Sequence, residues 1–334
     1  MSGRPAAITA FLARAGWADA ERRRLAGDAS FRKYERLGGS QGHAVLMDAP
    51  PPMENVASFL AVARHLHALG YSAPRIIAEE RAAGLLLIED LGDDTFTRLL
   101  AAGADEAALY ALAVDLLIDL HKHPRAPAIE LPPYDETRLF AEAALLTDWY
   151  LPAVGAAVAA DLREDYLARW RAAFRVFADT APTLVLRDYH VDNLMRLPSR
   201  NGVAACGLLD FQDAVLGPPA YDLVSLLEDA RRDVAPSVVA AMLERYQTAF
   251  PNLDRRRFAA EYAVLGAQRN AKIIGIFTRL MARDGKPLYL AHIPRVWRLL
   301  EGDLAHPALT EVRAWFDRHV PPPQRIAPAA RVPA

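Results

Sequence analysis

The sequence has very little cysteine and almost no net charge. Among 334 residues only Cys206 is a cysteine, which excludes an intrachain disulfide and any multi-cysteine metal site and favours a reducing compartment. The 39 basic and 41 acidic residues leave a formal net charge of -2. The chain as a whole therefore does not attract nucleic acid or an anionic membrane, so we expect any phosphate site to be local and the substrate to be small.

Long apolar runs are also absent. No stretch of about eighteen uninterrupted apolar residues occurs, as a membrane-spanning helix would need. Arg14, Asp19 and Arg22 interrupt the N-terminal segment, which lacks the apolar core of a signal peptide. We therefore expect a cytoplasmic protein with no membrane partner. A composition with 52% hydrophobic and 24% charged residues is that of a globular chain long enough for two cores.

Hydrophobic periodicity predicts an α+β fold in two parts. Residues 1–90 are expected to form a small unit with an antiparallel sheet and one main helix, and residues 91–320 a larger, mostly helical unit. Residues 321–334 are rich in Pro and Ala without apolar periodicity, which predicts a mobile tail. The expected helices are 6–16, 53–69, 236–249, 255–283, 293–301 and 309–319, and the expected strands are 31–37, 44–47, 75–79 and 85–89.

The run from Leu184 to Asn193, LVLRDYHVDN, places acidic and amide groups at the spacing that phosphoryl transfer requires. Asp188 is followed five residues later by Asn193, and Asp210 ends an apolar stretch about twenty residues further on. One carboxylate can orient an acceptor hydroxyl, while the other two side chains offer oxygen ligands to Mg²⁺. The pattern therefore predicts a kinase centred on Asp188, Asn193 and Asp210.

Three segments, DYHVDN (188–193), LDFQD (209–213) and GPPAYDL (217–223), resemble the aminoglycoside phosphotransferase family, whose relatives include choline kinase and protein kinases. The resemblance spans nearly the whole chain. It implies a two-lobed protein-kinase-like fold that binds ATP, with Asp188 as catalytic base and Asn193 and Asp210 as Mg²⁺ ligands.

The same resemblance implies roles for residues around that centre. Asp213 and Asp222 are expected to support the ligands, and His190 is expected to brace the catalytic loop rather than to carry a proton. The segment LLIEDLG (86–92), with Glu89 and Leu91, resembles the hinge whose backbone binds adenine.

The segment GDASFRKY, from Gly27 to Tyr34, occupies the place of the family's phosphate-covering turn. Backbone N–H groups near Ser30 and Phe31 are expected to bind the phosphates. Strand alternation places Arg32 on the same side as Tyr34, and we predict that Arg32 supplies the cation that faces the phosphates.

That cation is needed because the family's strand Lys is missing. Two other family residues, a Glu and a His, are missing as well. Met47 stands where the family usually has a strand Lys, and Phe59 stands near the place of the helix Glu that pairs with it. Loss of both partners is coherent, because one charge alone would lack its counter-ion. Leu186 replaces a His that usually braces the loop, which puts the loop geometry in question more than the chemistry.

Further segments are similar to the anomeric sugar kinases of cell-wall recycling, which phosphorylate N-acetylmuramate and N-acetylglucosamine at C1. They are VLMDAPP (45–51), LGAQRNAK (265–272), GIF (275–277) and RDGK (283–286). This similarity implies MgATP as the donor and an amino sugar as the small-molecule partner.

The acceptor contacts are expected on the C-terminal helices, where basic residues outnumber acids. Gln268, Arg269 and Lys272 are the candidates, since residues 268 and 272 share a helix face; a solvated basic face is the alternative. Trp149 and Tyr150, next to Asp148, could stack on a sugar ring, and Asp148 and Trp149 are candidate substrate contacts; packing of the aromatic side chains into the second unit is the alternative.

Two other functions remain open from the sequence. The chain could be a kinase of the same fold for an amino alcohol, a homoserine-like acceptor or an aminoglycoside. It could also be a nucleotide-binding pseudokinase, because the usual Lys, Glu and His are missing. The oligomeric state and the preferred sugar are not predicted.

Overall fold

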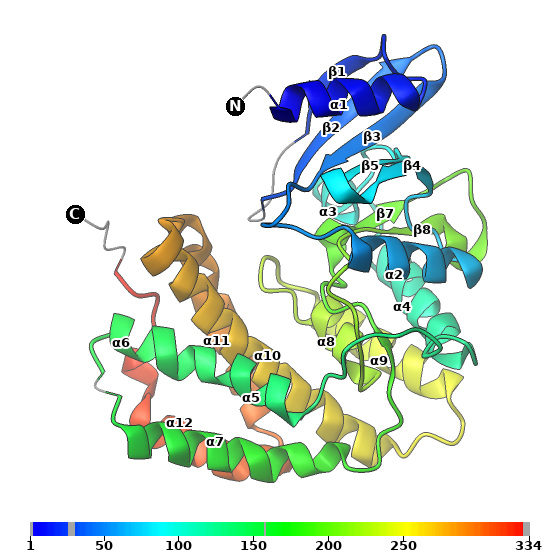
Figure 1. Cartoon of the computed structure of the whole chain (residues 1–334). Coiled ribbons are helices and arrows are strands. Elements are labelled where there is room, and N and C mark those ends of the chain that lie inside the picture. The colour runs from blue at the N-terminus through cyan, green and yellow to red at the C-terminus, as the bar shows by residue number, and fades with distance from the viewer. Residues whose placement is uncertain (1–2, 26–30, 157, 330–334) are drawn as a thin grey trace. The chain divides into compact units, whose positions relative to one another are not determined.

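The computed structural model describes residues 3–25, 31–156 and 158–329. The chain forms two compact units: residues 1–129 with 191–214, and residues 130–190 with 215–334. The predicted α+β class is confirmed, because an antiparallel sheet near the N-terminus is followed by a mostly helical remainder (Figure 1).

The first unit contains a five-stranded antiparallel sheet of order β1-β2-β3-β5-β4. Its strands are β1 (Glu21–Arg24), β2 (Lys33–Gly39), β3 (Gly42–Asp48), β4 (Ile76–Glu80) and β5 (Leu85–Glu89). Its helices are α1 (Gly3–Arg14), α2 (Ala57–Ala68), α3 (Phe96–Ala101) and α4 (Glu106–Lys122), and a separate hairpin is formed by β7 (Leu194–Arg196) and β8 (Cys206–Leu208).

Side-chain alternation gives the sheet two apolar faces. One face packs against α1, and this core contains Phe11, Leu12, Leu37, Leu46 and Leu87. The central strand β3 pairs with β2 and β5, so that Met47 lies between Tyr34 and Leu86 in the register. The central strands are buried on both faces, which explains their nearly continuous apolar sequences.

Two boundaries in this unit differ from the predictions. Strand β1 was not expected, because its four residues are all charged; it is an exposed edge strand, where charged side chains are common. Helix α2 begins at Ala57 rather than at residue 53, since residues 51–53 form a turn.

The segment after residue 90 also packs with the first unit. Thr95 bridges to Met195 of β7, and the Arg196 N–H donates to the Asp94 carbonyl at 2.8 Å. Helix α4 contacts β8 and the turn that precedes it. The first compact unit therefore extends to residue 129 rather than ending at residue 90. The boundary at residue 90 stays a prediction for the two kinase lobes.

The second unit is built around the long helix α10. Its helices are α5 (Glu136–Leu145), α6 (Leu151–Ala153), α7 (Ala160–Phe174), α8 (Ala220–Leu227), α9 (Pro236–Ala249), α10 (Arg255–Asp284), α11 (Ile293–Leu304) and α12 (Thr310–His319), and β6 (Thr183–Val185) pairs with β9 (Val215–Gly217). Helices α5, α8 and α11 pack on α10. Gly275 allows a close approach there, because a Cβ would lie only 2.3 Å from the backbone carbon of Leu145.

Part of the predicted mobile tail is anchored. The Tyr150 hydroxyl donates to the Gln324 carbonyl at 2.6 Å, and the Arg325 guanidinium pairs with Glu301 at 2.8 Å and with Asp317 at 2.7 Å. These polar contacts hold the segment in place, although its sequence has no apolar periodicity. Among the residues described, no helix is both long and apolar enough to span a bilayer.

Candidate active site

A pocket of about 280 Å³ lies in the first unit, on the sheet face opposite α1. Val45, Ile88 and Phe59 form its apolar side, and Phe59 stacks on Phe211 with ring centroids 5.0 Å apart. The segment from Glu89 to Gly92 also lines the pocket, which agrees with the position expected for Glu89 and Leu91. Apolar walls of this kind suit a flat heterocycle.

The hairpin of β7 and β8 positions two predicted metal ligands. Its antiparallel register pairs Leu194 with Leu208, so Asn193 just before β7 and Asp210 just after β8 lie at the same end. The Leu209 N–H donates to the Asn193 carbonyl at 2.9 Å and extends this pairing. Both side chains line the pocket described above.

The backbone of Asp210 adopts φ +55°, a left-handed conformation that is uncommon for a residue with a side chain. Gln212 supports its carboxylate, since Nε2 donates to Asp210 Oδ1 at 2.9 Å. Strained conformations of this kind concentrate at functional sites.

Arg32 lies beside this carboxylate in a group that we call the Arg32 cluster: Arg32, Glu54 and Asp210. The Arg32 guanidinium is 3.5 Å from Asp210 Oδ1 and 3.7 Å from Glu54 Oε2. Burial disfavours the charged form of Arg32, but Tyr34 and the carboxylates of Asp210 and Glu54 outweigh it and raise its pKa.

Glu54 was not predicted. It also accepts the Phe31 N–H at 3.1 Å, at the end of the expected phosphate-covering turn. No local motif marks Glu54, which lies between the turn at residues 51–53 and the start of α2. The positions of the missing pair are apolar, because Met47 is buried and Phe59 is stacked in the pocket wall.

Asp188 belongs to the second unit, in the loop after β6, and a buried carboxylate holds the start of that loop. Asp222 accepts the Leu186 N–H at 2.7 Å and the Arg187 N–H at 2.8 Å. Arg187 has φ +69°, so these two contacts stabilise an unusual backbone turn directly before Asp188. Burial raises the pKa of Asp222 to about 7, although both N–H groups favour its charged form.

A second support reaches the same turn from α8 and α10. The Ser225 hydroxyl donates to the Arg187 carbonyl at 2.9 Å, and Arg269 donates to Ser225 Oγ at 3.0 Å. Arg269 is only 5% exposed and also donates to the Glu228 carbonyl. These contacts favour a bracing role for Arg269, and its predicted sugar contact remains a prediction.

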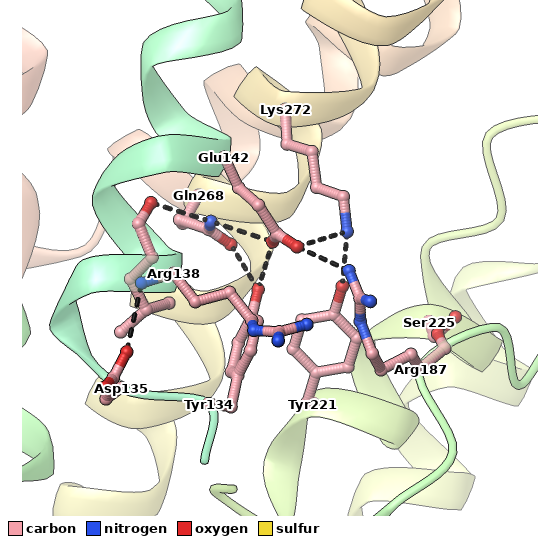
Figure 2. A network of polar contacts seen from close by, with 10 residues as sticks. Tyr134, Asp135, Arg138, Glu142, Arg187, Tyr221, Ser225, Gln268 and Lys272 are labelled. Carbon is pink, nitrogen blue, oxygen red and sulfur yellow. Dashed lines mark hydrogen bonds and ion pairs between the residues drawn. The ribbon is translucent and has the colours of Figure 1, made fainter. Parts of the chain in front are cut away.

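Figure 2 shows a polar network beside Arg187, which we call the Glu142 cluster: Glu142, Arg138, Arg187 and Lys272. Lys272 Nζ is 3.2 Å from Glu142 Oε1, and Arg187 pairs with the same oxygen. Burial raises the pKa of Glu142, but Lys272 and Arg187 outweigh burial and lower it overall. The buried Gln268 donates to Glu142 Oε2 at 3.4 Å, so residues 268 and 272 share a helix face as expected.

The remaining predicted residues are scattered. Asp148 and Trp149 lie in a π-helical turn that continues α5, where Asp148 pairs with Arg163 at 2.8 Å. Asp213 is exposed and contributes to the raised pKa of Arg32, and His190 is buried in its loop. Gly27 and Ser30 lie outside the described residues.

Within the described ranges, no group of three or more His, Cys, Asp or Glu side chains could hold a metal ion. Mg²⁺ in phosphoryl-transfer sites usually binds one or two protein groups together with substrate phosphates. The oxygen atoms of Asn193 and Asp210, at one end of the same hairpin, fit that donor set.

The sequence pattern of the phosphotransferase enzyme family matches residues 21–259. The chain is 42% identical to the N-acetylmuramate/N-acetylglucosamine kinase of Caulobacter vibrioides, over 96% of this chain and 98% of the relative. It is 38% identical to the enzyme of the same name from Pseudomonas aeruginosa, over 89% of each chain.

Solved structures resemble the fold at low sequence identity. A choline/ethanolamine kinase family protein from Mesorhizobium loti matches with a TM-score of 0.64 and 15% identity, over 93% of this chain and 98% of that one. The ADP-bound aminoglycoside phosphotransferase APH(2'')-Ib matches with a TM-score of 0.59 and 16% identity, over 87% and 94%.

Proposed function

Because the chain belongs to the phosphotransferase enzyme family, we propose that it transfers the γ-phosphoryl group of ATP to the anomeric hydroxyl of N-acetylmuramate or N-acetylglucosamine. The chemistry is carried by one observation: the β7–β8 hairpin brings Asn193 and Asp210 to one end, at a pocket of suitable size for a nucleotide base. The acceptor is taken from the names of the relatives.

Asn193 and Asp210 would hold Mg²⁺, which neutralises the charge of the phosphates when bound. Asp188 would accept the proton of the acceptor hydroxyl as its oxygen forms a bond to the γ-phosphorus and the bond to the β-phosphate oxygen breaks. The products are the sugar 1-phosphate and ADP. Asp222 contributes by fixing the backbone directly before Asp188, so that the base is oriented in advance.

Arg32 would supply the phosphate-facing cation in place of the missing strand Lys. Its support is the Arg32 cluster itself, in which Glu54 takes the part of the missing helix Glu. Arginine offers several N–H donors in a fixed plane, which suits phosphate oxygens. The single cysteine is buried and free, which fits an enzyme of the reducing cytoplasm. Its proposed partner is a small-molecule sugar.

The test is a coupled ADP-release assay with both sugars, choline, homoserine and kanamycin as acceptors. We expect turnover with the sugars and a loss of about 10²- to 10⁴-fold in kcat for Asp188→Asn. Asp179→Asn, the same change at a side chain 88% exposed, should stay close to wild type. A sugar 1-phosphate should release phosphate in mild acid, whereas a 6-phosphate persists. Turnover of choline, homoserine or kanamycin alone, or nucleotide binding without any turnover, would refute the proposal.

A further inference from the structure

The Glu142 cluster contains more positive than negative charge. Its single carboxylate faces two cations, since Lys272 lies 3.2 Å from Glu142 Oε1 and Arg187 pairs with the same atom. The Tyr134 hydroxyl donates to the other oxygen, Glu142 Oε2, at 2.5 Å. The cluster is largely shielded from water, because the exposed fractions of the Glu142, Arg187 and Lys272 side chains are only 12%, 15% and 13%.

Arg138 adds a third cation. It lies one helical turn before Glu142 on α5, and Figure 2 shows its side chain directed toward the side of the network where Tyr134 and Tyr221 lie. Within the described part of the chain, its half-buried guanidinium has neither a hydrogen bond nor an ion pair. Glu142 therefore pairs with two of the three cations, Lys272 and Arg187, and the Arg138 guanidinium is the one available to a ligand.

Such an arrangement is unfavourable unless an anion completes it. Partly buried like charges repel one another, and a guanidinium away from bulk water gains most from a carboxylate that it can bind through two N–H groups. Two further carboxylates adjoin the cluster, but Asp135 accepts only the backbone N–H of Arg138, at 3.1 Å, and Asp188 acts on Arg187. A negative charge that pairs with the Arg138 guanidinium is thus expected from outside the chain.

The cluster also adjoins the proposed base and offers a surface for a sugar. Arg187 directly precedes Asp188, whose carboxylate is among the charges that raise the pKa of Arg187 against the effect of its burial. The rings of Tyr134 and Tyr221 lie edge to face with centroids 5.0 Å apart, and Lys272 lies 3.2 Å from the Tyr221 hydroxyl. Aromatic faces with polar tips are suited to the apolar and polar sides of a pyranose.

We propose that Arg138, with Lys272 and Arg187, forms an anion subsite for a carboxylate carried by the acceptor. This inference deepens the proposed function and depends on it. N-acetylmuramate carries such a carboxylate on its lactyl ether, whereas N-acetylglucosamine is neutral. The subsite therefore selects the acidic sugar, and Glu142 opposes that selection by competing for the same cations.

The test is the ratio of kcat/KM for N-acetylmuramate to kcat/KM for N-acetylglucosamine. Arg138→Gln removes the charge but keeps a polar side chain, and we expect the ratio to fall about tenfold or more through a higher KM for N-acetylmuramate. Arg138→Lys should recover part of it. Arg256→Gln is the matched control, because Arg256 is exposed on α10 about 24 Å before Lys272 and should leave the ratio unchanged.

A second variant moves the ratio the other way. Glu142→Gln removes the competing carboxylate, so the ratio should rise. Turnover of N-acetylglucosamine reports whether each variant is folded. An unchanged ratio in Arg138→Gln, or equal losses with both sugars, would overturn the subsite while leaving the kinase proposal intact.

Direct binding separates the two failures. If the wild type phosphorylates neither sugar, the proposed function is wrong. Calorimetry then decides about the subsite: binding of N-acetylmuramate that Arg138→Gln weakens supports it, and absence of binding by the wild type overturns it.

Discussion

The Arg32 cluster and the Glu142 cluster have opposite compositions. In the first unit one guanidinium pairs with two carboxylates, whereas in the second unit one carboxylate pairs with two cations and Arg138 lies beside them. An excess of acid suits a divalent cation, and an excess of base suits an anionic substituent. A formal net charge of -2 reveals neither excess, because the 39 basic and 41 acidic residues nearly cancel in the sum over the chain.

The largest expected effect comes from removing an acid of the Arg32 cluster. Asp210→Asn should lower kcat by about 100-fold or more and raise the Mg²⁺ concentration needed for half-maximal activity, because a metal ligand is lost. Activity is measured as ADP release over a series of Mg²⁺ concentrations. Asp179→Asn, the same change at a side chain 88% exposed, is the control. A normal Mg²⁺ dependence in Asp210→Asn would show that the acidic excess does not serve a metal.

The next effect concerns the support of the Glu142 cluster. Asp222 accepts one backbone N–H on each oxygen, and Asn has only one carbonyl oxygen, so one donor would face an NH₂ group. Asp222→Asn should therefore lower the free energy of unfolding by about 1–3 kcal/mol. Denaturant unfolding measures this change. Leu186 and Arg187 would then lose their fixed backbone, and kcat should fall with stability.

The same variant has a pH signature. Burial raises the pKa of Asp222 to about 7 from a reference value of 3.8, so the native state binds more protons than the unfolded chain between these values. This group therefore makes the free energy of unfolding of the wild type fall as the pH rises from about 4 to 7, and Asn removes that contribution. The destabilisation should be largest at about pH 4, shrink as the pH rises toward 7 and level off above pH 7; a difference that grows with pH would contradict the assignment.

Local spacing explains which site residues could be predicted. Asp188 and Asn193 belong to one short loop, and Asp210 ends the strand that pairs with the next, so a linear motif contains all three. Gln268 and Lys272 reach the same network because they are one helical turn apart. The fold class followed from periodicity in the same way, since the helices and central strands repeat their apolar residues.

Long-range contacts explain the residues that were missed. Glu142 and Arg187 are 45 positions apart and meet only through the packing of α5 against the second unit's core. Glu54 lies in an irregular segment without a motif, and β1 is a charged edge strand whose pairing no apolar pattern could reveal. Arg269 was placed correctly on α10, but its burial against Ser225 depends on the position of α8.

The smallest effect tests whether Glu54 acts through Arg32. Glu54→Gln keeps an acceptor for the Phe31 N–H and removes only the charge, so Arg32 is left with Asp210 as its remaining partner in the cluster. A partly exposed ion pair contributes about 1 kcal/mol, which corresponds to about a fivefold higher KM for ATP, with little change in the KM for the sugar. Glu79→Gln, which alters an exposed ion pair with Arg64, is the control.

If Glu54 positions Arg32, the double variant Arg32→Gln/Glu54→Gln should match Arg32→Gln alone, because the Glu54 change then has no Arg32 guanidinium left to disturb. Additive losses would mean that the two side chains act independently, and the acidic surroundings of Arg32 would then serve the metal alone.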